Sequence, residues 1–181
     1  LANVCPGTSV DYSIPGVPGA TFYIWTYTGT GTILSGTTTL PLNTLIFGLT
    51  ATGGTLTVTP ANLCGNGTSS SFVITTNVLP TASISYPSLT YCTSVSPVSV
   101  TQTGTAGGTY TTIPATGLSI NASTGQITPS TSIAGTYVVT YTFTSGCTNT
   151  ASTTVTINSV GVITASATPA TVCTGGNVQL L

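Results

Sequence analysis

The chain has 181 residues and one charged side chain, that of Asp11; Lys, Arg, His, Glu and Met are absent. Without basic residues it cannot neutralise phosphates, which excludes nucleic-acid binding and attraction to anionic membranes. The same inventory supplies no base for a serine nucleophile and no second carboxylate for glycoside hydrolysis, so we expect no enzyme.

Thr and Ser make up about a third of the residues, and no segment has helical periodicity. Thr, Val, Ile and Tyr favour strands, and Gly and Pro separate the candidate strands at intervals typical of an all-β sandwich. No apolar run is long enough to cross a membrane, so we expect no membrane insertion. In the first part of the chain we predict strands at 9–14, 21–27, 32–35, 45–49, 55–59 and 70–77.

In the second part we predict strands at 81–86, 98–101, 109–112, 135–143 and 151–157, with a strand–turn–strand at 118–127. Further strands are expected at 163–168 and 177–181, so the chain ends within a predicted strand and we expect the polypeptide to continue. Strand alternation predicts that Phe72 and Ile74 face inward, as do Tyr137, Val139, Tyr141, Phe143, Val155 and Ile157.

Three cysteines, Cys5, Cys92 and Cys173, each follow an apolar residue and precede turn-forming residues, at intervals of 87 and 81 residues. An interval of that size is typical of a tandem array. Cys64 and Cys147 lie between them, which predicts the intramodule disulfides Cys5–Cys64 and Cys92–Cys147 and leaves Cys173 unpaired in this segment. No cysteines form close pairs and histidine is absent, so we expect disulfides in an oxidising compartment and neither a metal nor another cofactor.

These observations predict three modules: residues 1–79, residues 80–158, and residues 159–181 as the first strands of a third, incomplete module. Several segments resemble known repeat families. In the first module they are Val4-Cys5-Pro6-Gly7, Tyr23-Ile24-Trp25 and Asn62-Leu63-Cys64-Gly65, which resemble the PKD-like module of large secreted surface proteins of Bacteroidota. In the second, Val100 to Gly104, Gly117 to Asn121 and Ala134-Gly135-Thr136-Tyr137 resemble the immunoglobulin-like repeats found beside it.

The resemblance implies an array of β-sandwiches in a secreted or cell-surface adhesin or filament, typically exported by type IX secretion. It also implies that the Tyr137 hydroxyl bonds back to the backbone before its strand, as in immunoglobulin folds. The partners it implies are neighbouring modules or copies of the same protein.

Tyr23, Trp25 and Tyr27 alternate along one predicted strand. They could form an aromatic platform for surface glycans, or they could belong to a sandwich core. In either case Phe22 and Ile24 point the other way, and we predict that they meet a partner. Asn66 and Asn121 begin triplets of the N-glycosylation pattern and are candidate sugar attachment sites.

Two functions follow from these features. The first is a structural segment of an extracellular adhesin or filament, whose uncharged strand faces tolerate lateral contact. The alternative is a carbohydrate- or surface-binding module that uses the aromatic strand of the first domain.

Overall fold

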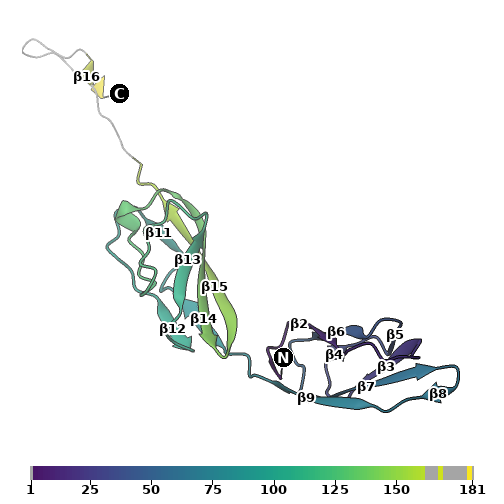
Figure 1. Ribbon diagram of the computed structural model, residues 1–181. Helices are drawn as coiled ribbons and strands as arrows, with labels where there is room; N and C mark the ends of the chain where they lie inside the picture. The colour runs from purple at the N-terminus through teal and green to yellow at the C-terminus, as the bar shows by residue number, and fades with distance from the viewer. Residues whose placement is uncertain (1, 162–166, 169–178, 181) are drawn as a thin grey trace, which may run out of the picture. The chain divides into compact units, whose positions relative to one another are not determined.

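A computed structural model describes residues 2–161, 167–168 and 179–180 of the chain (Figure 1). The fold is all-β, as predicted, and the described residues contain one short 3-10 helix, η1 (Pro129–Thr131). By its internal contacts the chain divides into two compact units. Unit 1 comprises Leu1–Ile84, Gln102–Thr109 and Tyr141–Ala151, and unit 2 comprises Ser85–Thr101, Tyr110–Thr140 and Ser152–Leu181.

Two sheets formed by residues 3–76 make the N-terminal sandwich, which lies within unit 1 (Figure 1). The larger sheet has the order β1 (Asn3–Val4), β9 (Ser70–Thr76), β7 (Gly54–Asn62), β3 (Phe22–Tyr27) and β5 (Thr37–Thr38), and β8 (Gly65–Asn66) also pairs with β7. The smaller sheet has the order β2 (Ser9–Ser13), β6 (Leu42–Phe47) and β4 (Thr32–Ile33).

The core of the N-terminal sandwich follows from alternation along these strands. The sheets bury one face of β3, β6 and β7, with Tyr23, Trp25, Leu45, Phe47, Leu56 and Val58 each at most 4 % exposed. Ile74 on β9 faces inward and is buried, as predicted, whereas Phe72 faces the same way but is 45 % exposed. Phe72 lies toward the inner side, but at an open edge where the ring of Tyr12 is its neighbour, with ring centroids 6.2 Å apart.

Outside the N-terminal sandwich, a four-stranded sheet has the order β11 (Thr90–Cys92), β15 (Cys147–Asn158), β14 (Gly135–Ser145) and β13 (Thr109–Ile113). The inward positions of β14 and β15 are as predicted, with Tyr137, Val139, Tyr141, Phe143, Val155 and Ile157 all buried. β10 (Ala82–Ser85) pairs with β12 (Thr101–Gly104) in a separate two-stranded sheet. Residues 118–127 form a turn with isolated bridges and no full strands.

The Tyr137 hydroxyl donates a hydrogen bond to the carbonyl oxygen of Ile133 at 2.9 Å, which confirms the predicted tyrosine corner. Gly117 makes room for it: a Cβ atom at this position would lie 2.4 Å from the Tyr137 hydroxyl. Gly117 also has a φ of +108°, a region that side-chain-bearing residues rarely adopt. Residue 117 must therefore be glycine for the corner to form.

Hydroxyl pairs take the place of ion pairs on the outward strand faces. Hydrogen bonds between two side-chain hydroxyl oxygens, 2.7–3.2 Å apart, link the cross-strand pairs Thr57–Ser71, Thr59–Ser69, Ser83–Thr103, Thr136–Thr156, Thr140–Ser152 and Thr144–Thr148. Such cross-strand pairs stabilise a sheet by about 0.2–1 kcal/mol each. Because they carry no charge, they should respond little to salt.

The third predicted module lies almost wholly outside the described residues, including Cys173 and the predicted strand 163–168 apart from its last two positions. β16 (Ala167–Thr168) pairs with β17 (Gln179–Leu180). No helix of the described residues could cross a membrane.

Tyr86 gives the fold a specific sensitivity to alkaline pH. Its hydroxyl is buried and donates to the Gly125 carbonyl oxygen at 2.5 Å. Burial raises the pKa of Tyr86 above its usual value of 10.0, and neighbouring Tyr110 and Tyr91 raise it further. In the unfolded chain Tyr86 ionises near pH 10, while in the folded chain it keeps its proton, so its stabilising contribution is lost as the pH rises above about 10.

We therefore expect the free energy of unfolding, measured by urea titration, to change little between about pH 5 and 7.5, where no side chain of this chain has its ordinary pKa. Above about pH 10 it should fall. The variant Tyr86→Phe should show a smaller fall than the parent chain. An identical fall in both proteins would assign the alkaline effect to other groups.

Candidate functional site

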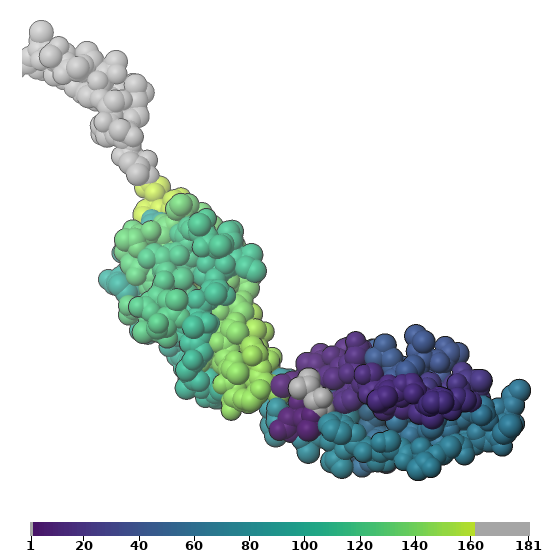
Figure 2. All heavy atoms as spheres, viewed as in Figure 1, coloured from purple at the N-terminus to yellow at the C-terminus, as the bar shows by residue number. Residues whose placement is uncertain are grey.

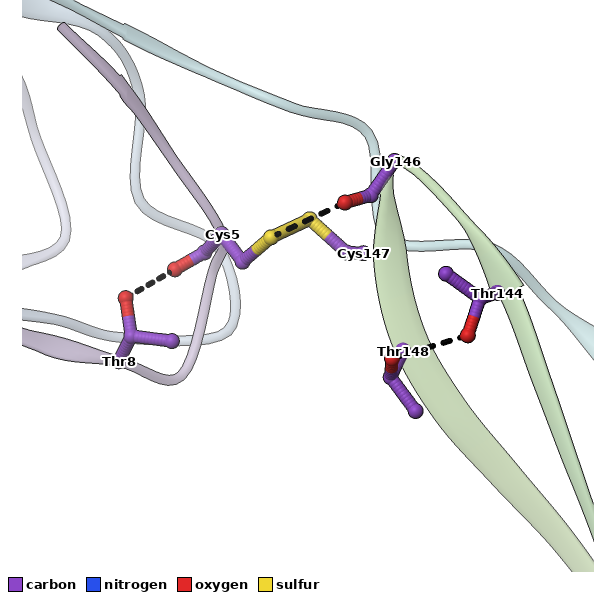
Figure 3. The surroundings of a disulfide bond; sticks show 6 residues. All are labelled: Cys5, Thr8, Thr144, Gly146, Cys147 and Thr148. Atoms are coloured by element: carbon purple, nitrogen blue, oxygen red, sulfur yellow. Dashed lines mark hydrogen bonds between the residues drawn. A yellow bond between two sulfur atoms is a disulfide. The ribbon is translucent and has the colours of Figure 1, made fainter. Parts of the chain in front are cut away.

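The chain contains one disulfide among its described residues, and it joins Cys5 to Cys147 with a Cα–Cα distance of 5.7 Å (Figure 3). Cys5 follows β1, and Cys147 begins β15 directly after Gly146, which forms the turn from β14. Cys64 and Cys92 are free and exposed. The predicted pairs Cys5–Cys64 and Cys92–Cys147 were therefore wrong, although the expectation of a disulfide was confirmed.

Strand register explains why Cys5 cannot reach Cys64. β1 runs parallel to β9 with Val4 opposite Thr76, and the neighbouring Ile74 pairs with Gly54, the first residue of β7. Cys64 lies beyond the other end of β7, after nine residues of strand, a separation of about 30 Å. Figure 1 shows β8, which follows Cys64, at the end of the N-terminal sandwich opposite the marked N-terminus. Disulfides need Cα atoms about 4.4–6.8 Å apart.

The same geometry separates Cys92 from Cys147. β11 runs parallel to β15, and Cys92 pairs with Asn158, the last residue of β15. Cys147 is the first residue of that strand, so the two positions are about 36 Å apart at the usual rise per residue.

The contacts of the disulfide are shown in Figure 3. The Cys5 carbonyl oxygen accepts a hydrogen bond from the Thr8 hydroxyl at 2.7 Å, and the Cys5 sulfur lies 3.8 Å from the carbonyl oxygen of Gly146. The Thr144 and Thr148 hydroxyls pair across the hairpin on either side of the turn. Cys147 is 2 % exposed, so water has little access to its sulfur.

The predicted aromatic platform does not face solvent. Tyr23 and Trp25 are 4 % and 3 % exposed, and the Trp25 indole N–H donates to the Thr38 hydroxyl at 2.9 Å. Tyr27 is partly buried, and its hydroxyl donates to the Thr52 carbonyl oxygen at 3.0 Å. Burial raises the pKa of Tyr27. The core interpretation of this strand is the correct one, and the glycan platform on it was wrong.

Phe22 and Ile24 lie on the other face of β3, where both are half-buried. They pair with Ala61 and Thr59 of β7. A partner for them stays a prediction. Asn66 and Asn121 are exposed, and the Asn121 side-chain oxygen accepts the backbone N–H groups of Ser123 and Thr124, so it shapes its turn. Glycosylation at either residue also stays a prediction.

A groove of about 420 Å³ opens at the edge of the N-terminal sandwich, and sequence reasoning did not identify it. Residues from β2, β3, β7 and β9 line it, among them Asp11, Tyr12, Ser70 and Phe72. Asp11 also accepts a hydrogen bond from the Thr44 hydroxyl at 2.6 Å. Burial raises the pKa of Tyr12, and Tyr27 raises it further. The groove offers hydroxyls, one carboxylate and aromatic edges, which suit an uncharged polar ligand.

No metal centre is assembled by the residues that the structure describes: no three His, Cys, Asp or Glu side chains come together there. Buried polar side chains in the same residues all have hydrogen-bond partners.

Comparison with known proteins gives one family match. A family model, the PKD-like domain, matches residues 1–74. No curated protein matches the chain.

Several solved structures show limited similarity to the chain. A chimeric titin Z1Z2 carrying a peptide from decorin is 15 % identical, with 86 % of this chain and 91 % of that chain covered and a TM-score of 0.35. Murine CEACAM1b is 13 % identical, with 88 % and 96 % covered and a TM-score of 0.34. A four-domain Dscam1 fragment is 15 % identical, with 87 % and 42 % covered and a TM-score of 0.31. The chain has an all-β fold, and its residues 1–74 match the PKD-like domain.

Proposed function

We propose that this chain is a structural segment of an extracellular adhesin or surface filament, in which its modules act as spacers and packing units without catalysis. We take the modules to be residues 1–79, 80–158 and 159–181, and the whole protein to be a type IX secretion substrate of the Bacteroidota kind that the sequence resembles. The observation that carries the proposal is the Cys5–Cys147 disulfide, which joins positions 142 residues apart. A bond of this kind persists in an oxidising compartment and fixes the distance between the segments it joins.

The surface of the N-terminal sandwich supports a packing role. On the outer face of the smaller sheet, Ile33 of β4 pairs with Ile46 of β6, and they are 70 % and 42 % exposed. Leu42 on the same strand is 45 % exposed. With a net charge of −1 the chain has little electrostatic repulsion to keep copies apart. We therefore propose that copies associate through this face.

The test is sedimentation velocity over a range of concentrations, with thiols blocked by iodoacetamide so that only noncovalent association is measured. We expect the mean mass to rise with concentration, and we expect Ile46→Thr to reduce that rise. The matched control is Ile133→Thr, which replaces an exposed isoleucine of unit 2 and should leave association unchanged. A parent chain that stays monomeric at every concentration would contradict the packing role.

A second candidate function uses the groove beside Phe72. We propose an uncharged polar ligand of the sugar class, because aromatic edges and hydroxyl groups of the groove could stack against and hydrogen-bond such a molecule. Screening on a glycan array would test it, with Asp11→Asn and Phe72→Ala expected to remove any binding. No binding by the parent chain would rule this candidate out.

A further inference from the structure

Two cysteine positions in the fold are joined by the Cys5–Cys147 bond, and each can be defined by topology. The first position, represented by Cys5, comes at the end of the opening strand of a sheet. This opening strand, β1 for Cys5, runs parallel to β9, the last strand of the same sheet along the chain. The second, represented by Cys147, lies at the turn that leads out of the neighbouring strand in the sheet. The disulfide shows that a cysteine of the first kind bonds to a cysteine of the second kind.

The two free cysteines occupy the same two positions. The sheet orders β1-β9-β7-β3 and β11-β15-β14-β13 correspond strand for strand. Cys92 is the last residue of β11 and pairs with Asn158 of β15. Cys5 comes directly after β1, one residue beyond the Val4–Thr76 pair. Cys5 is therefore level with Asn77, which follows β9. Cys64 lies in the turn after β7, the counterpart of β14. Cys92 is thus of the first kind and Cys64 of the second.

The surroundings of both free cysteines are unlike those of the bonded pair. Cys64 and Cys92 are exposed, whereas Cys147 is 2 % exposed. Apolar side chains near them also face solvent: Leu63, beside Cys64 in the β7–β8 hairpin, is fully exposed. By the colour bar of Figure 2, the chain near residue 65 lies at one end of the N-terminal sandwich. Leu89 and Val160, near Cys92 and its pairing partner Asn158, are 59 % and 55 % exposed. Contact with another chain would cover these side chains.

We propose that Cys92 of one copy forms a disulfide with Cys64 of another copy, which links copies head to tail. The inference rests on the proposed function, in which copies of this chain are building blocks of a larger assembly. Each linkage requires an oxidant, for which glutathione disulfide is sufficient. The Cys92 and Cys64 thiols release two protons and two electrons, the new S–S bond forms, and glutathione disulfide is reduced to two glutathione thiols.

The two ends of the linkage differ, so the contact is heterologous and can extend into a chain of copies. Among its described residues each copy presents one free cysteine of each kind, and each can be removed separately. The proposed pairing of Cys92 with Cys64 can therefore be tested with matched variants that each retain only one of these two cysteines.

The experiment uses the 181-residue chain carrying Cys173→Ser, so that only Cys64 and Cys92 are free. One variant adds Cys64→Ser and the other adds Cys92→Ser; both replaced residues are exposed, and circular dichroism checks that both variants fold. Each is incubated with glutathione disulfide, alone and mixed. Non-reducing electrophoresis measures dimer, and mass spectrometry of chymotryptic peptides identifies the joined cysteines.

We expect a Cys64–Cys92 dimer in the mixture, about tenfold more abundant than the dimer of either variant alone, which corresponds to about 1.4 kcal/mol of preference. Two results would overturn the proposal: Cys64–Cys64 and Cys92–Cys92 dimers as abundant as the mixed one, or no dimer although the thiols react with Ellman's reagent. Because this experiment measures covalent linkage and sedimentation of the thiol-blocked chain measures packing, failure of one is distinguishable from failure of the other.

Discussion

A chain carrying Cys5→Ser is expected to lose up to about 5 kcal/mol of its free energy of unfolding, because the disulfide closes a loop with a sequence separation of 142. In the chain-entropy account, opening so long a loop gives the unfolded chain many more conformations, which favours unfolding. Cys5 is only half-buried, so the serine hydroxyl should add little cost of its own. Urea titration followed by the fluorescence of Trp25, the single tryptophan, measures the loss.

Cys92→Ser is the matched control for this variant. It also replaces a cysteine at the end of an opening strand, but one that is free and exposed. We expect its unfolding to match that of the parent chain. Reduction of the parent by dithiothreitol should reproduce the effect of Cys5→Ser, and equal stability of Cys5→Ser and Cys92→Ser would contradict a stabilising role for the bond.

Trp25→Ala should cost about 3–5 kcal/mol of the free energy of unfolding of the N-terminal sandwich, since it removes the largest side chain of the core. The change leaves a cavity beside Leu45, Phe47 and other buried residues of the same cluster, and it removes the hydrogen bond to the Thr38 hydroxyl. Urea titration followed by circular dichroism measures the loss, because the variant lacks the fluorescent residue.

Phe22→Ala on the same strand is the control. Phe22 is half-buried on the opposite face, so we expect a clearly smaller loss. Equal losses in the two variants would contradict the assignment of the Trp25 face to the core.

Alternation of side chains along strands predicted most of the buried core. It placed Ile74 on the inner face, and this residue is buried, as are the inward positions of β14 and β15. Phe72 also faces inward but is 45 % exposed, because alternation gives the face on which a side chain lies, while burial also requires a neighbouring element to cover it. At Phe72 the two sheets leave a groove open.

Disulfide pairing could not be predicted from the order of the cysteines. Order alone suggested that the first and the next cysteine close one module, whereas pairing depends on which strand ends meet. The parallel pairing of β1 with β9 places Cys5 at the end of the sheet opposite Cys64. The sequence held one signal against the predicted pairing of Cys147. This cysteine lies between two long predicted strands, as expected of a residue in a hairpin turn. Such a turn lies a whole strand length away from the far end of the strand that follows it.

Single-molecule stretching can test whether the Cys5–Cys147 bond makes this chain a spacer of fixed length, as we propose. With attachment points before Cys5 and after Asn158, the bond shields from force the loop that it closes, which has a sequence separation of 142. We predict that the oxidised chain unfolds without releasing this length, and that dithiothreitol adds about 50 nm of extension, the reach of 142 residues at about 3.5 Å each. The same full extension with and without reductant would contradict the claim.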